Sequence, residues 1–317
     1  MAGAMRGAAA VLLLSLMPSA ALAGPCIQWR APERIGSLDT SLLPEASGIA
    51  ASRSYPGRLY LNNDSGDGPY FYFTDMTGGP TARVAVSGMV PRDVEDVALG
   101  ACPGAAQTCL WLGDIGDNAR KRDTVTFVAL TERADYPAEV APLRTIAARY
   151  PDGPHDAESF AIHPDGDLFL ITKDYDVRAR TNGPGLIYRL RAARMATARP
   201  GDVLTFEPVG RVDLPALIAD VFINQVATAM DISPDGTRVA VLTYRTLMDW
   251  NVDLAHGVSA ARKLAPGRDY TLTPLGPLPQ AEAVAWLANE DGVVYTTEAA
   301  GPAKEAPLYR QLCAKRD

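Results

Sequence analysis

The sequence is poor in residues that bind transition metals and carries no surplus of positive charge. Its 317 residues include only 3 histidines and 4 cysteines, with no Cys-x-x-Cys pair, which argues against zinc or a redox metal. Lys and Arg number 30 against 37 Asp and Glu, a formal net charge of −7. Nucleic acids and anionic membranes select basic surfaces. We therefore expect no nucleic-acid partner, and a cation or a neutral ligand is favoured.

Long hydrophobic runs are absent beyond the first residues. The N-terminal segment has Arg6, an apolar run from Ala8 to Met17 and small residues up to Ala23, the pattern of a secretory signal peptide. We expect residues 1–23 to be removed and residues 24–317 to form one domain, periplasmic or secreted. No later stretch approaches the roughly 20 apolar residues that a membrane helix needs, so membrane insertion is not expected.

Export would place the four cysteines in an oxidising compartment, where they can form two disulfides with three possible pairings. Cys102 and Cys109 enclose the short loop CPGAAQTC, whereas Cys26 and Cys313 lie near the two ends of the mature chain. We predict the pairs Cys102–Cys109 and Cys26–Cys313.

Glycine and proline are frequent, and they punctuate a repeat. The chain has 27 Gly and 25 Pro, which favours many short turns over a helical bundle. Five segments, spaced about 60 residues apart, share a pattern of acidic, small and apolar residues. They are PEASGIAAS from Pro44, DVEDVALG from Asp93, DAESFAIHPDGDLFLITK from Asp156, ATAMDISPDGTRVAVLTY from Ala227 and QAEAVAW from Gln280.

Aligning the third and fourth segments on Pro-Asp-Gly makes Glu158 equivalent to Thr228, and the other segments then place Glu45, Glu95 and Glu282 in the same slot. Each unit continues with a second hydrophobic strand: LYLNN, CLWLG, DLFLIT, RVAVLT and GVVYTT. Such runs of β-branched and aromatic residues, bounded by turn residues, indicate strands.

The third unit contains two further strands, which we place at 185–190 and 203–207. Four-stranded units repeated around an axis predict an all-β fold, a five-bladed β-propeller, with six blades as the alternative. The last unit has chain for only three strands. A strand at 27–30 or 34–38 can pair with it and close the ring, which removes its exposed edges. A monomer is expected.

Two turns carry a resemblance to known propellers. Ser233-Pro-Asp-Gly-Thr-Arg-Val-Ala resembles the repeat core of bacterial periplasmic propellers akin to the Tol-system protein, and His163-Pro-Asp-Gly-Asp-Leu is a second copy. With Glu-x-Ser-Gly-Ile opening the first unit and Glu-Asp, Asp-Ala-Glu and Glu-Ala opening later ones, the chain is similar to the group related to esterase-like phytase domains. The resemblance covers most of the mature chain and implies a propeller, usually six-bladed, with phytase-like catalysis.

Loops that enter the first strands and loops that leave the second strands share one face of a propeller, because antiparallel strands alternate in direction. Repeated carboxylates reach that face. Those we take as candidate metal ligands are Glu45, Asp64, Glu95, Asp114, Asp117 and Glu282. A crowded ring of carboxylates requires raised pKa values or compensating cations. Carboxylates, Asn amides and carbonyls suit Ca²⁺, so calcium is the expected cofactor.

Structural interpretations compete with this one. The Asp and Gly residues of loops 62–67 and 113–118 can simply form tight turns, and the repeated glutamates can accept backbone N–H bonds from a neighbouring blade. The symmetry breaks in the fourth unit, where Thr228 replaces glutamate and Arg245 follows the second strand. One sector of the ring is then basic, which suits an anionic ligand bridged to a cation.

Two hypotheses of function follow. The candidate catalytic residues are Glu158, Lys173, Arg245 and His155. In the first hypothesis the protein is a Ca²⁺-dependent hydrolase of an anionic phosphoester or a lactone-like ester; Glu158 is the base, and Lys173 and Arg245 hold negative charge. His155 is an acid or base, or a solvated loop residue. In the second, a non-catalytic propeller binds a glycan, a metabolite or a cell-envelope protein. Segment 215–225 covers the site or packs beside it.

Overall fold

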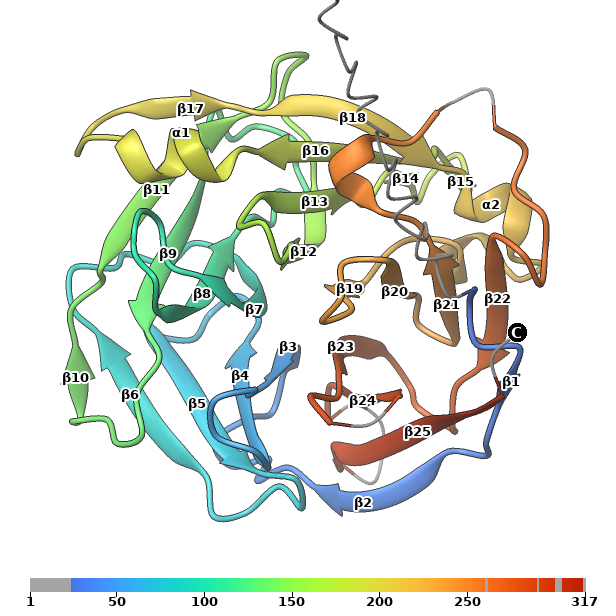
Figure 1. Ribbon diagram of the computed structural model, residues 1–317, viewed down its shortest axis with the longest axis horizontal. Coiled ribbons are helices and arrows are strands. Elements are labelled where there is room, and N and C mark those ends of the chain that lie inside the picture. Colours follow the sequence, from blue (N-terminus) through green and yellow to red (C-terminus); the bar gives the residue numbers. More distant parts are fainter. Residues whose placement is uncertain (1–23, 260–261, 290, 300–303, 316–317) are drawn as a thin grey trace, which may run out of the picture.

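The computed structural model describes residues 24–259, 262–289, 291–299 and 304–315. The signal peptide predicted for residues 1–23 lies outside the described residues. The described chain is almost entirely β, and its main sheets are arranged around a central axis (Figure 1). The predicted five-bladed propeller is confirmed, and the six-bladed alternative is wrong.

Each blade is an antiparallel meander of consecutive strands, and blades 1 and 2 each gain one short outer strand that pairs in parallel. Blade 1 contains β3 (Ala46–Ala51), β4 (Arg58–Asn63), β5 (Tyr70–Asp75), β6 (Ala82–Val86) and β10 (Glu139–Val140). Blade 2 contains β7 (Val94–Ala101), β8 (Thr108–Asp114), β9 (Val125–Thr131), β11 (Arg144–Arg149) and β17 (Val203–Thr205). Blade 3 contains β12 (Ala157–Ile162), β13 (Leu168–Thr172), β16 (Gly185–Leu190) and β18 (Glu207–Val212).

The remaining two blades complete the ring. Blade 4 contains β19 (Ala229–Ile232), β20 (Arg238–Leu242), β21 (Thr246–Asn251) and β22 (Tyr270–Pro274). Blade 5 contains β23 (Ala281–Trp286), β24 (Gly292–Thr297) and β25 (Pro307–Lys315), joined by β1 (Gln28–Trp29) and β2 (Glu33–Ser37). The first strands of the blades, β3, β7, β12, β19 and β23, contact one another in sequence, and β23 contacts β3. We call the face where these five strands begin the mouth.

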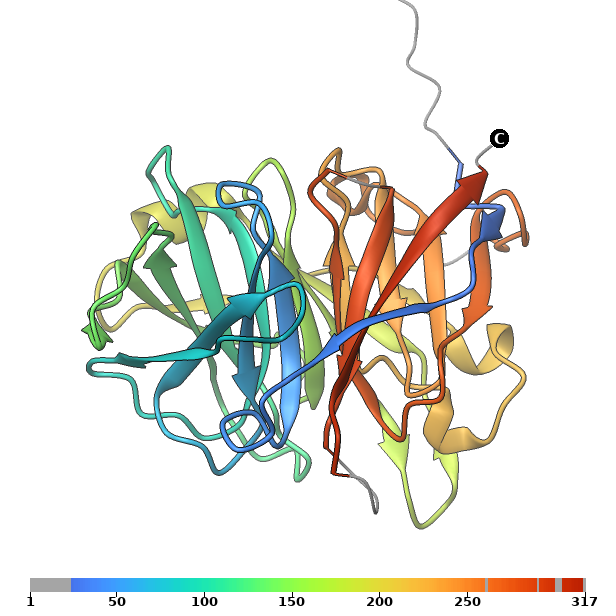
Figure 2. The ribbon, with the colours of Figure 1, turned by 90° about the horizontal axis from the view of Figure 1, so that it is seen from below.

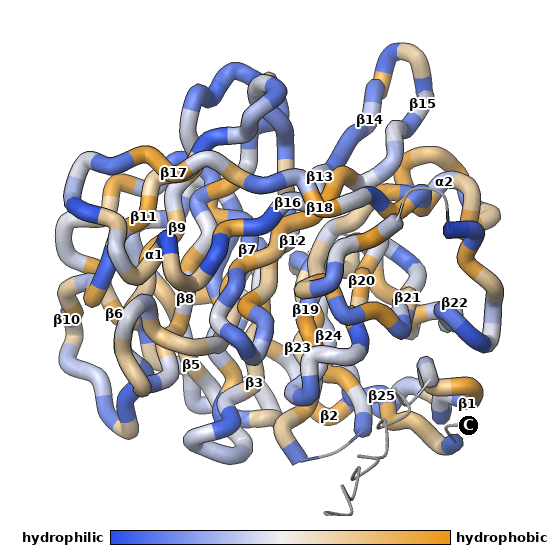
Figure 3. The backbone as a smooth tube through the Cα atoms, turned by 45° about the horizontal axis from the view of Figure 1, so that its top comes forward, coloured by the Kyte–Doolittle hydropathy of each residue, from blue (hydrophilic) through white to orange (hydrophobic). Residues whose placement is uncertain are grey.

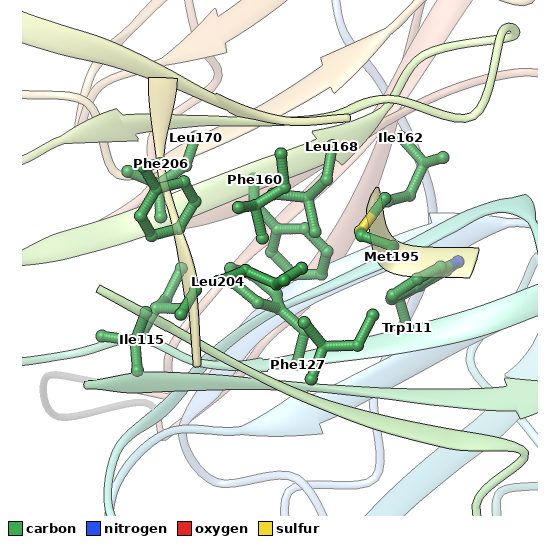
Figure 4. Packing of buried hydrophobic residues seen from close by; sticks show 14 of the residues in the cluster. Trp111, Ile115, Phe127, Phe160, Ile162, Leu168, Leu170, Met195, Leu204 and Phe206 are labelled. Atoms are coloured by element: carbon green, nitrogen blue, oxygen red, sulfur yellow. The ribbon is translucent and has the colours of Figure 1, made fainter. Parts of the chain in front are cut away.

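The core lies between the blades. A blade that packs between two others buries both faces of its sheet, and every residue of β12 and β13 is buried. Figure 3 shows the hydrophobic strands and the hydrophilic loops that join them. Between blades 2 and 3, Trp111, Phe127 and Phe160 pack together with Met195 of α1 (Ala192–Thr197) (Figure 4). Burying one such aromatic side chain contributes about 1.5–3 kcal/mol, so face-to-face packing holds the ring together.

The N-terminal segment closes the ring. Both β1 and β2 pair antiparallel with β25, and Cys26 forms a disulfide with Cys313. The backbone N–H of Cys26 also donates to the buried carboxylate of Asp249, at 2.6 Å. In the loop-entropy model a bond that spans most of the chain contributes about 5 kcal/mol. The predicted closure and both predicted disulfides, Cys102–Cys109 included, are confirmed.

One predicted strand pairs elsewhere. Residues 203–207 are predicted as the fourth strand of blade 3, but β17 pairs in parallel with β11 of blade 2. The fourth strand of blade 3 is the following segment, β18, which pairs with β16. Local sequence reveals a strand here, but the choice of partner depends on where the chain passes between the two blades.

Aspartates on two first strands join neighbouring blades. Asp96 on β7 accepts a hydrogen bond from the backbone N–H of Phe160 on β12, at 3.0 Å, and Asp231 on β19 accepts one from Trp286 on β23, at 2.7 Å. These two aspartates therefore play the inter-blade role that the sequence analysis considered for the repeated glutamates. Within the described part of the chain, no helix has the length and apolar character needed to cross a membrane.

Candidate functional site

A β-bulge recurs at the mouth end of four first strands. The pairing with the second strand skips one residue in each, and the skipped residues are Ser47 in β3, Glu95 in β7, Glu158 in β12 and Glu282 in β23. Bulges re-aim side chains and are common beside functional sites. The structural equivalent of the three glutamates in blade 1 is thus Ser47, which corrects the alignment that placed Glu45 in that slot. Glu45 lies two residues earlier and is exposed.

Blade 4 departs from this pattern. Its first strand pairs with the second without a bulge, and the equivalent residue, Thr228, is fully buried. The Thr228 hydroxyl donates to the backbone carbonyl of Ala281 in blade 5, at 2.7 Å. This sector of the ring therefore contributes an inter-blade hydrogen bond in place of a carboxylate.

Three carboxylates converge where blade 2 meets blade 1. Oxygens of Asp64, Asp93 and Glu95 all lie within 4.8 Å of one another. Burial raises the pKa of Asp93 to about 6, and nearby Asp64 adds to the shift. Burial also raises the pKa of Glu95 well above its usual range, with further contributions from Glu158, Asp64 and Asp93. We call these three residues the blade 2 carboxylates.

A glycine makes room for this group. A Cβ atom on Gly116 would lie 2.2 Å from Oε1 of Glu95 and 2.4 Å from Oδ2 of Asp93. No side chain fits at that position without displacing the two carboxylates. The turn after β8 therefore needs glycine at 116 because Asp93 and Glu95 press against its backbone.

Blade 3 presents a carboxylate that is paired. Lys173, at the end of β13, donates hydrogen bonds to Glu158 and to the hydroxyl of Tyr244, the latter at 3.1 Å. Its Nζ also lies 5.3 Å from the ring centre of Tyr175 and 5.5 Å from that of Tyr244, a cation–π arrangement. We call Glu158, Lys173 and Tyr244 the blade 3 polar group.

The pKa values of this group reflect burial and pairing. Burial raises the pKa of Glu158 to about 7, although Lys173 opposes the shift. Burial lowers the pKa of Lys173, but Glu158 and Tyr244 outweigh it and the pKa of Lys173 is raised. Lys173 therefore stays charged at neutral pH, whereas the pKa of Glu158 lies close to neutral pH.

Two buried carboxylate oxygens beside this group lack partners. Asp156 is 2% exposed, and its Oδ1 accepts the backbone N–H of Asp117 at 2.8 Å. Its Oδ2, and Oε2 of Glu158, have no hydrogen-bond partner among the described residues. An unsatisfied buried acceptor of this kind costs about 1–3 kcal/mol, so a positively charged or hydrogen-bond-donating ligand would stabilise the mouth.

Blade 5 contributes a carboxylic acid. Burial raises the pKa of Glu282 to about 10, with nearby Glu158 and a hydrogen bond to Glu298 adding to the shift. Burial also raises the pKa of Glu298. Glu282 is thus protonated at neutral pH and donates to Glu298.

Asp114 and Asp117, both predicted as metal ligands, bind the loop that contains them. Asp114 forms an ion pair with Arg122 at 2.8 Å and accepts the backbone N–H groups of Arg92 and Asp93. Asp117 accepts the backbone N–H of Arg122 at 2.7 Å. The structure therefore places Asp114 next to the backbone of Asp93, and it engages both carboxylates in protein contacts.

Two predicted catalytic residues lie apart from the blade 3 polar group. Arg245 is exposed and forms no ion pair within 4 Å among the described residues, while the preceding Tyr244 reaches Lys173. His155 packs against Tyr188, whose hydroxyl lies 3.1 Å from Nε2 of the histidine, and Nε2 lies 3.2 Å from Asp152. Its contacts are therefore with the third strand of blade 3 and the loop before β12.

Asp93 is one of the site residues that were not predicted from the sequence. A signal for it was present, because Asp93-Val-Glu95 in blade 2 repeats as Asp156-Ala-Glu158 in blade 3. The aspartate of each pair stands two residues before the bulged glutamate, the position that Glu45 occupies in blade 1. The alignment matched only the glutamates of the units, so it did not identify this second acidic position.

A hairpin and a short helical segment flank the mouth. The strands β14 (Tyr175–Asp176) and β15 (Thr181–Asn182) form a hairpin that projects from one face of the propeller (Figure 2). Asn182 donates to the carbonyl of Phe222 in η1 (Phe222–Asn224), which follows α2 (Leu214–Leu217). Leu214 and Ile218 pack in the core between blades 3 and 4. Segment 215–225 therefore packs beside the mouth; the 3₁₀ helix η2 (Leu254–His256) lies farther along in blade 4.

Solved structures that resemble this chain share little of its sequence. No protein-family model matches it, and no curated protein does. Among solved structures it is similar to an auxiliary nutrient binding protein from Bacteroides thetaiotaomicron (8% identity, TM-score 0.47, covering 90% of this chain and 77% of that one). It is also similar to a putative glucose dehydrogenase-type oxidoreductase from Thermus thermophilus (13%, 0.48, 90% and 100%).

A third similar structure is the Swd1 β-propeller domain of Myceliophthora thermophila, with 12% identity, a TM-score of 0.40 and coverage of 88% of this chain and 99% of that one. At these identities the likeness is one of fold. The fold itself rests on the strand pairing described above: the chain is an all-β protein of the β-propeller class.

Proposed function

We propose that the mouth of the propeller binds a calcium ion and that the protein hydrolyses an ester there, a phosphoester or a lactone-like ester. The convergence of Asp64, Asp93 and Glu95 carries this proposal. Carboxylate oxygens are the donors that Ca²⁺ prefers. The ion pairs nearby are Arg120–Asp174, Arg122–Asp114 and Lys173–Glu158, and none of them includes a blade 2 carboxylate.

Independent support comes from the unpartnered oxygens in blade 3. Oδ2 of Asp156 and Oε2 of Glu158 are buried without a donor among the described residues, although the folded state normally satisfies such groups. The residues present therefore suit a hard, positively charged ion: Asp64, Asp93 and Glu95 converge without an ion-paired cation among the described residues, and a buried oxygen of Asp156 lacks a donor there.

Asp64, Asp93 and Glu95 would hold the calcium ion, whose positive charge would polarise a phosphoryl or carbonyl oxygen. Glu158, with its pKa near neutrality, accepts a proton from water as the water oxygen bonds to phosphorus or to the carbonyl carbon. The bond from that atom to the ester oxygen then breaks. Glu282, protonated at neutral pH, gives its proton to the departing oxygen, and Lys173 holds negative charge on the reacting group. Such a separation of two carboxyl pKa values is typical of acid–base pairs.

The resemblance to esterase-like phytase domains supports a phosphoester over a lactone. We also propose that the protein is exported, since both disulfides are of the kind that persist in oxidising compartments. The hydrolase is preferred to a non-catalytic binding propeller because Glu282, whose pKa burial raises, lies close enough to the lysine-paired carboxylate of Glu158 for that charge to raise its pKa further, and ester hydrolysis uses such a neighbouring acid and base.

The test begins with calcium itself. The purified protein is melted in excess chelator and again with calcium restored, and calcium binding is measured by titration calorimetry. Hydrolysis of p-nitrophenyl phosphate, bis(p-nitrophenyl) phosphate and δ-valerolactone is then followed in both conditions. We expect stoichiometric calcium, a melting temperature several degrees higher with calcium, and calcium-dependent turnover of at least one ester.

Each other outcome decides against part of the proposal. Calcium binding with no hydrolysis of any of the three esters would favour the binding propeller. A melting temperature that calcium does not change, together with no heat of binding, would make the mouth carboxylates structural and overturn the proposal as a whole.

A further inference from the structure

The segment from the end of β8, residues 114–122, contacts both the blade 2 carboxylates and blade 3. Arg122 ends this segment, and its side chain is 11% exposed and points back into the loop. The guanidinium donates to the carbonyl of Gly116 at 2.6 Å and to the carbonyl of Asp114 at 3.0 Å, and it pairs with the Asp114 carboxylate at 2.8 Å. One side chain thus fixes both ends of the turn at 114–116.

The turn at 114–116 also holds the backbone of Asp93. Oδ1 of Asp114 accepts the backbone N–H of Asp93 at 3.1 Å, and the backbone N–H of Gly116 donates to the carbonyl of Asp93 at 3.2 Å. Both backbone polar groups of Asp93, the N–H and the carbonyl, are therefore held by hydrogen bonds to this turn. The backbone of Gly116 also bears directly on the carboxylates of Asp93 and Glu95. The positions of two of the three blade 2 carboxylates consequently depend on where Arg122 holds this turn.

The same loop reaches blade 3. The backbone N–H of Asp117 donates to Asp156, and the carboxylate of Asp117 accepts the backbone N–H of Arg122. Farther along, Arg120 pairs with Asp174 at 2.6 Å, next to Lys173. Arg120 adopts φ 51°, a left-handed conformation that non-glycine residues avoid. Such strained residues persist only where surrounding contacts hold them, and they cluster at functional sites.

We propose that Arg122, acting with Asp114, is a positioning residue that holds the turn at 114–116 so that Asp64, Asp93 and Glu95 converge on one cation. The inference rests on the proposed function and deepens it, because it assigns Asp114 and Arg122 to the support of the cation site. Arg122 does not bind the cation, and its positive charge repels it.

That repulsion makes the sign of the effect diagnostic. If Arg122 acted only through its charge, the variant Arg122→Gln would bind calcium more tightly, because a nearby positive charge is removed. A positioning role predicts the opposite, since loss of three contacts to the turn lets Asp93 and Gly116 move apart. Losing a group that orients a ligand typically weakens metal affinity by about 10–100-fold.

The experiment compares Arg122→Gln and Arg122→Lys with the wild type by calcium titration calorimetry. We expect calcium affinity to fall about tenfold or more in both, since lysine keeps the charge but cannot reproduce the forked contacts of arginine. The matched controls are Lys121→Gln and Arg92→Gln, which remove exposed positive charges on the same loop and on the residue before Asp93. We expect their affinities to stay within about twofold of the wild type.

Two further measurements keep the outcome decisive. Melting in chelator shows whether each variant folds, and Asp114→Asn, which keeps an oxygen for the backbone of Asp93 but loses the ion pair, replaces Arg122→Gln if the latter does not fold. Hydrolysis at saturating calcium is then expected to recover to within about threefold of the wild type, because excess cation re-forms the site. A direct role of Arg122 on the substrate would leave turnover low at every calcium concentration.

Unchanged or tighter calcium binding in Arg122→Gln, or an unchanged affinity in Arg122→Lys, overturns the inference. Failure of the proposed function is distinguishable from this, because in that case the wild type itself binds no calcium and the variants are not compared.

Discussion

Blades 2 and 3 begin with the same acidic pattern but balance its charge differently. Each has an aspartate two residues before a bulged glutamate, Asp93 with Glu95 and Asp156 with Glu158. In blade 3 the glutamate is paired with Lys173, contributed by the second strand of the same blade. In blade 2 the corresponding strand ends in Asp114, which is already engaged by Arg122.

The third member of the blade 2 group comes from blade 1. Asp64 follows β4 and adds a negative charge beside Glu95, whereas the corresponding glutamate of blade 3 pairs with a lysine. The comparison shows that one repeated motif can serve two purposes: an excess of carboxylate suited to a cation, and a balanced pair suited to proton transfer. What differs is the charged residue that approaches the motif: Lys173 from the second strand of blade 3 itself, and Asp64 from the end of the second strand of blade 1.

The largest expected effect concerns the blade 3 base. Glu158→Gln removes the group proposed to accept the proton from water, and we expect turnover to fall by about 10³-fold. Calcium affinity should change by less than about threefold, since the blade 2 carboxylates are intact. Turnover and calorimetry on the same preparation check both. If Glu158→Gln lost calcium binding as severely as a blade 2 variant, the assignment of cation binding to blade 2 and proton transfer to blade 3 would be wrong.

The next effect concerns the cation site itself. Glu95→Gln removes one of three charged oxygens, and we expect calcium affinity to fall by about 100-fold, because ligand charge sets the affinity of such sites. In chelator the same variant should be more stable by about 1 kcal/mol, a rise of about 2–4 °C in Tm, since repulsion among buried carboxylates is relieved. Calorimetry and melting curves measure the two effects. A lower Tm in chelator would instead make Glu95 a structural residue.

Stability in chelator should also depend on pH. The pKa of Asp93 is raised to about 6 and that of Glu158 to about 7, so the folded chain binds these protons more tightly than the unfolded chain. Stability is therefore greatest at low pH within this window and falls as pH rises from about 4 to about 7. Carboxyl groups with a lowered pKa, such as Asp269 at about 2, have the opposite effect on stability. Their contribution is lost only as the pH falls from about 4 toward 2, below this window.

Calcium should flatten this dependence, because the cation favours the ionised carboxylates. Melting temperatures measured every half pH unit, with chelator and with calcium, test the prediction. Asp93→Asn is the matched variant and should reduce the slope in chelator between about pH 4 and pH 6. A melting temperature in chelator that rises through this window would contradict it.

The smallest effect separates the two alignments of blade 1. The Ser47 hydroxyl lies 3.4 Å from Glu95 and donates to it, so Ser47→Ala should weaken calcium binding by about threefold, the value of a modest hydrogen bond. Glu45→Gln, on an exposed side chain, should change it by less than twofold, within about the range of surface charges. Calorimetry on the two variants ranks them, and a larger effect of Glu45→Gln would favour the alignment made from sequence alone.

Much of the architecture was predictable because short stretches of the sequence determine it. Strand segments rich in Leu, Val and Ile, separated by Pro-Asp-Gly turns, indicated the blades, and Cys26 with Cys313 indicated how the ring closes. The exception, residues 203–205, is short and pairs outside its own unit. Its partner is chosen by the path of the chain between blades 2 and 3, which no local pattern encodes.

The candidate site was predictable only in part. The sequence indicated an acidic mouth and the proximity of Glu158 and Lys173, because both positions follow from strand direction. It misplaced the equivalent residue of blade 1 because a β-bulge shifts the register by one residue and leaves no clear mark in the sequence. It also overlooked Asp93, whose significance depends on Asp64 from another blade.

The sequence by itself determined that this chain forms a closed ring of five β-sheet units with carboxylates gathered at one end, since hydrophobic patterning, turn residues and cysteine positions act over short stretches. Only the tertiary structure decided which carboxylates meet and which are already paired. Asp114, Glu158 and Glu95 are all acidic residues at strand ends, yet Arg122 engages the first, Lys173 the second, and neither reaches the third. The reason is that each pairing joins side chains from different strands, loops or blades, so the local charge balance exists only once the ring has closed.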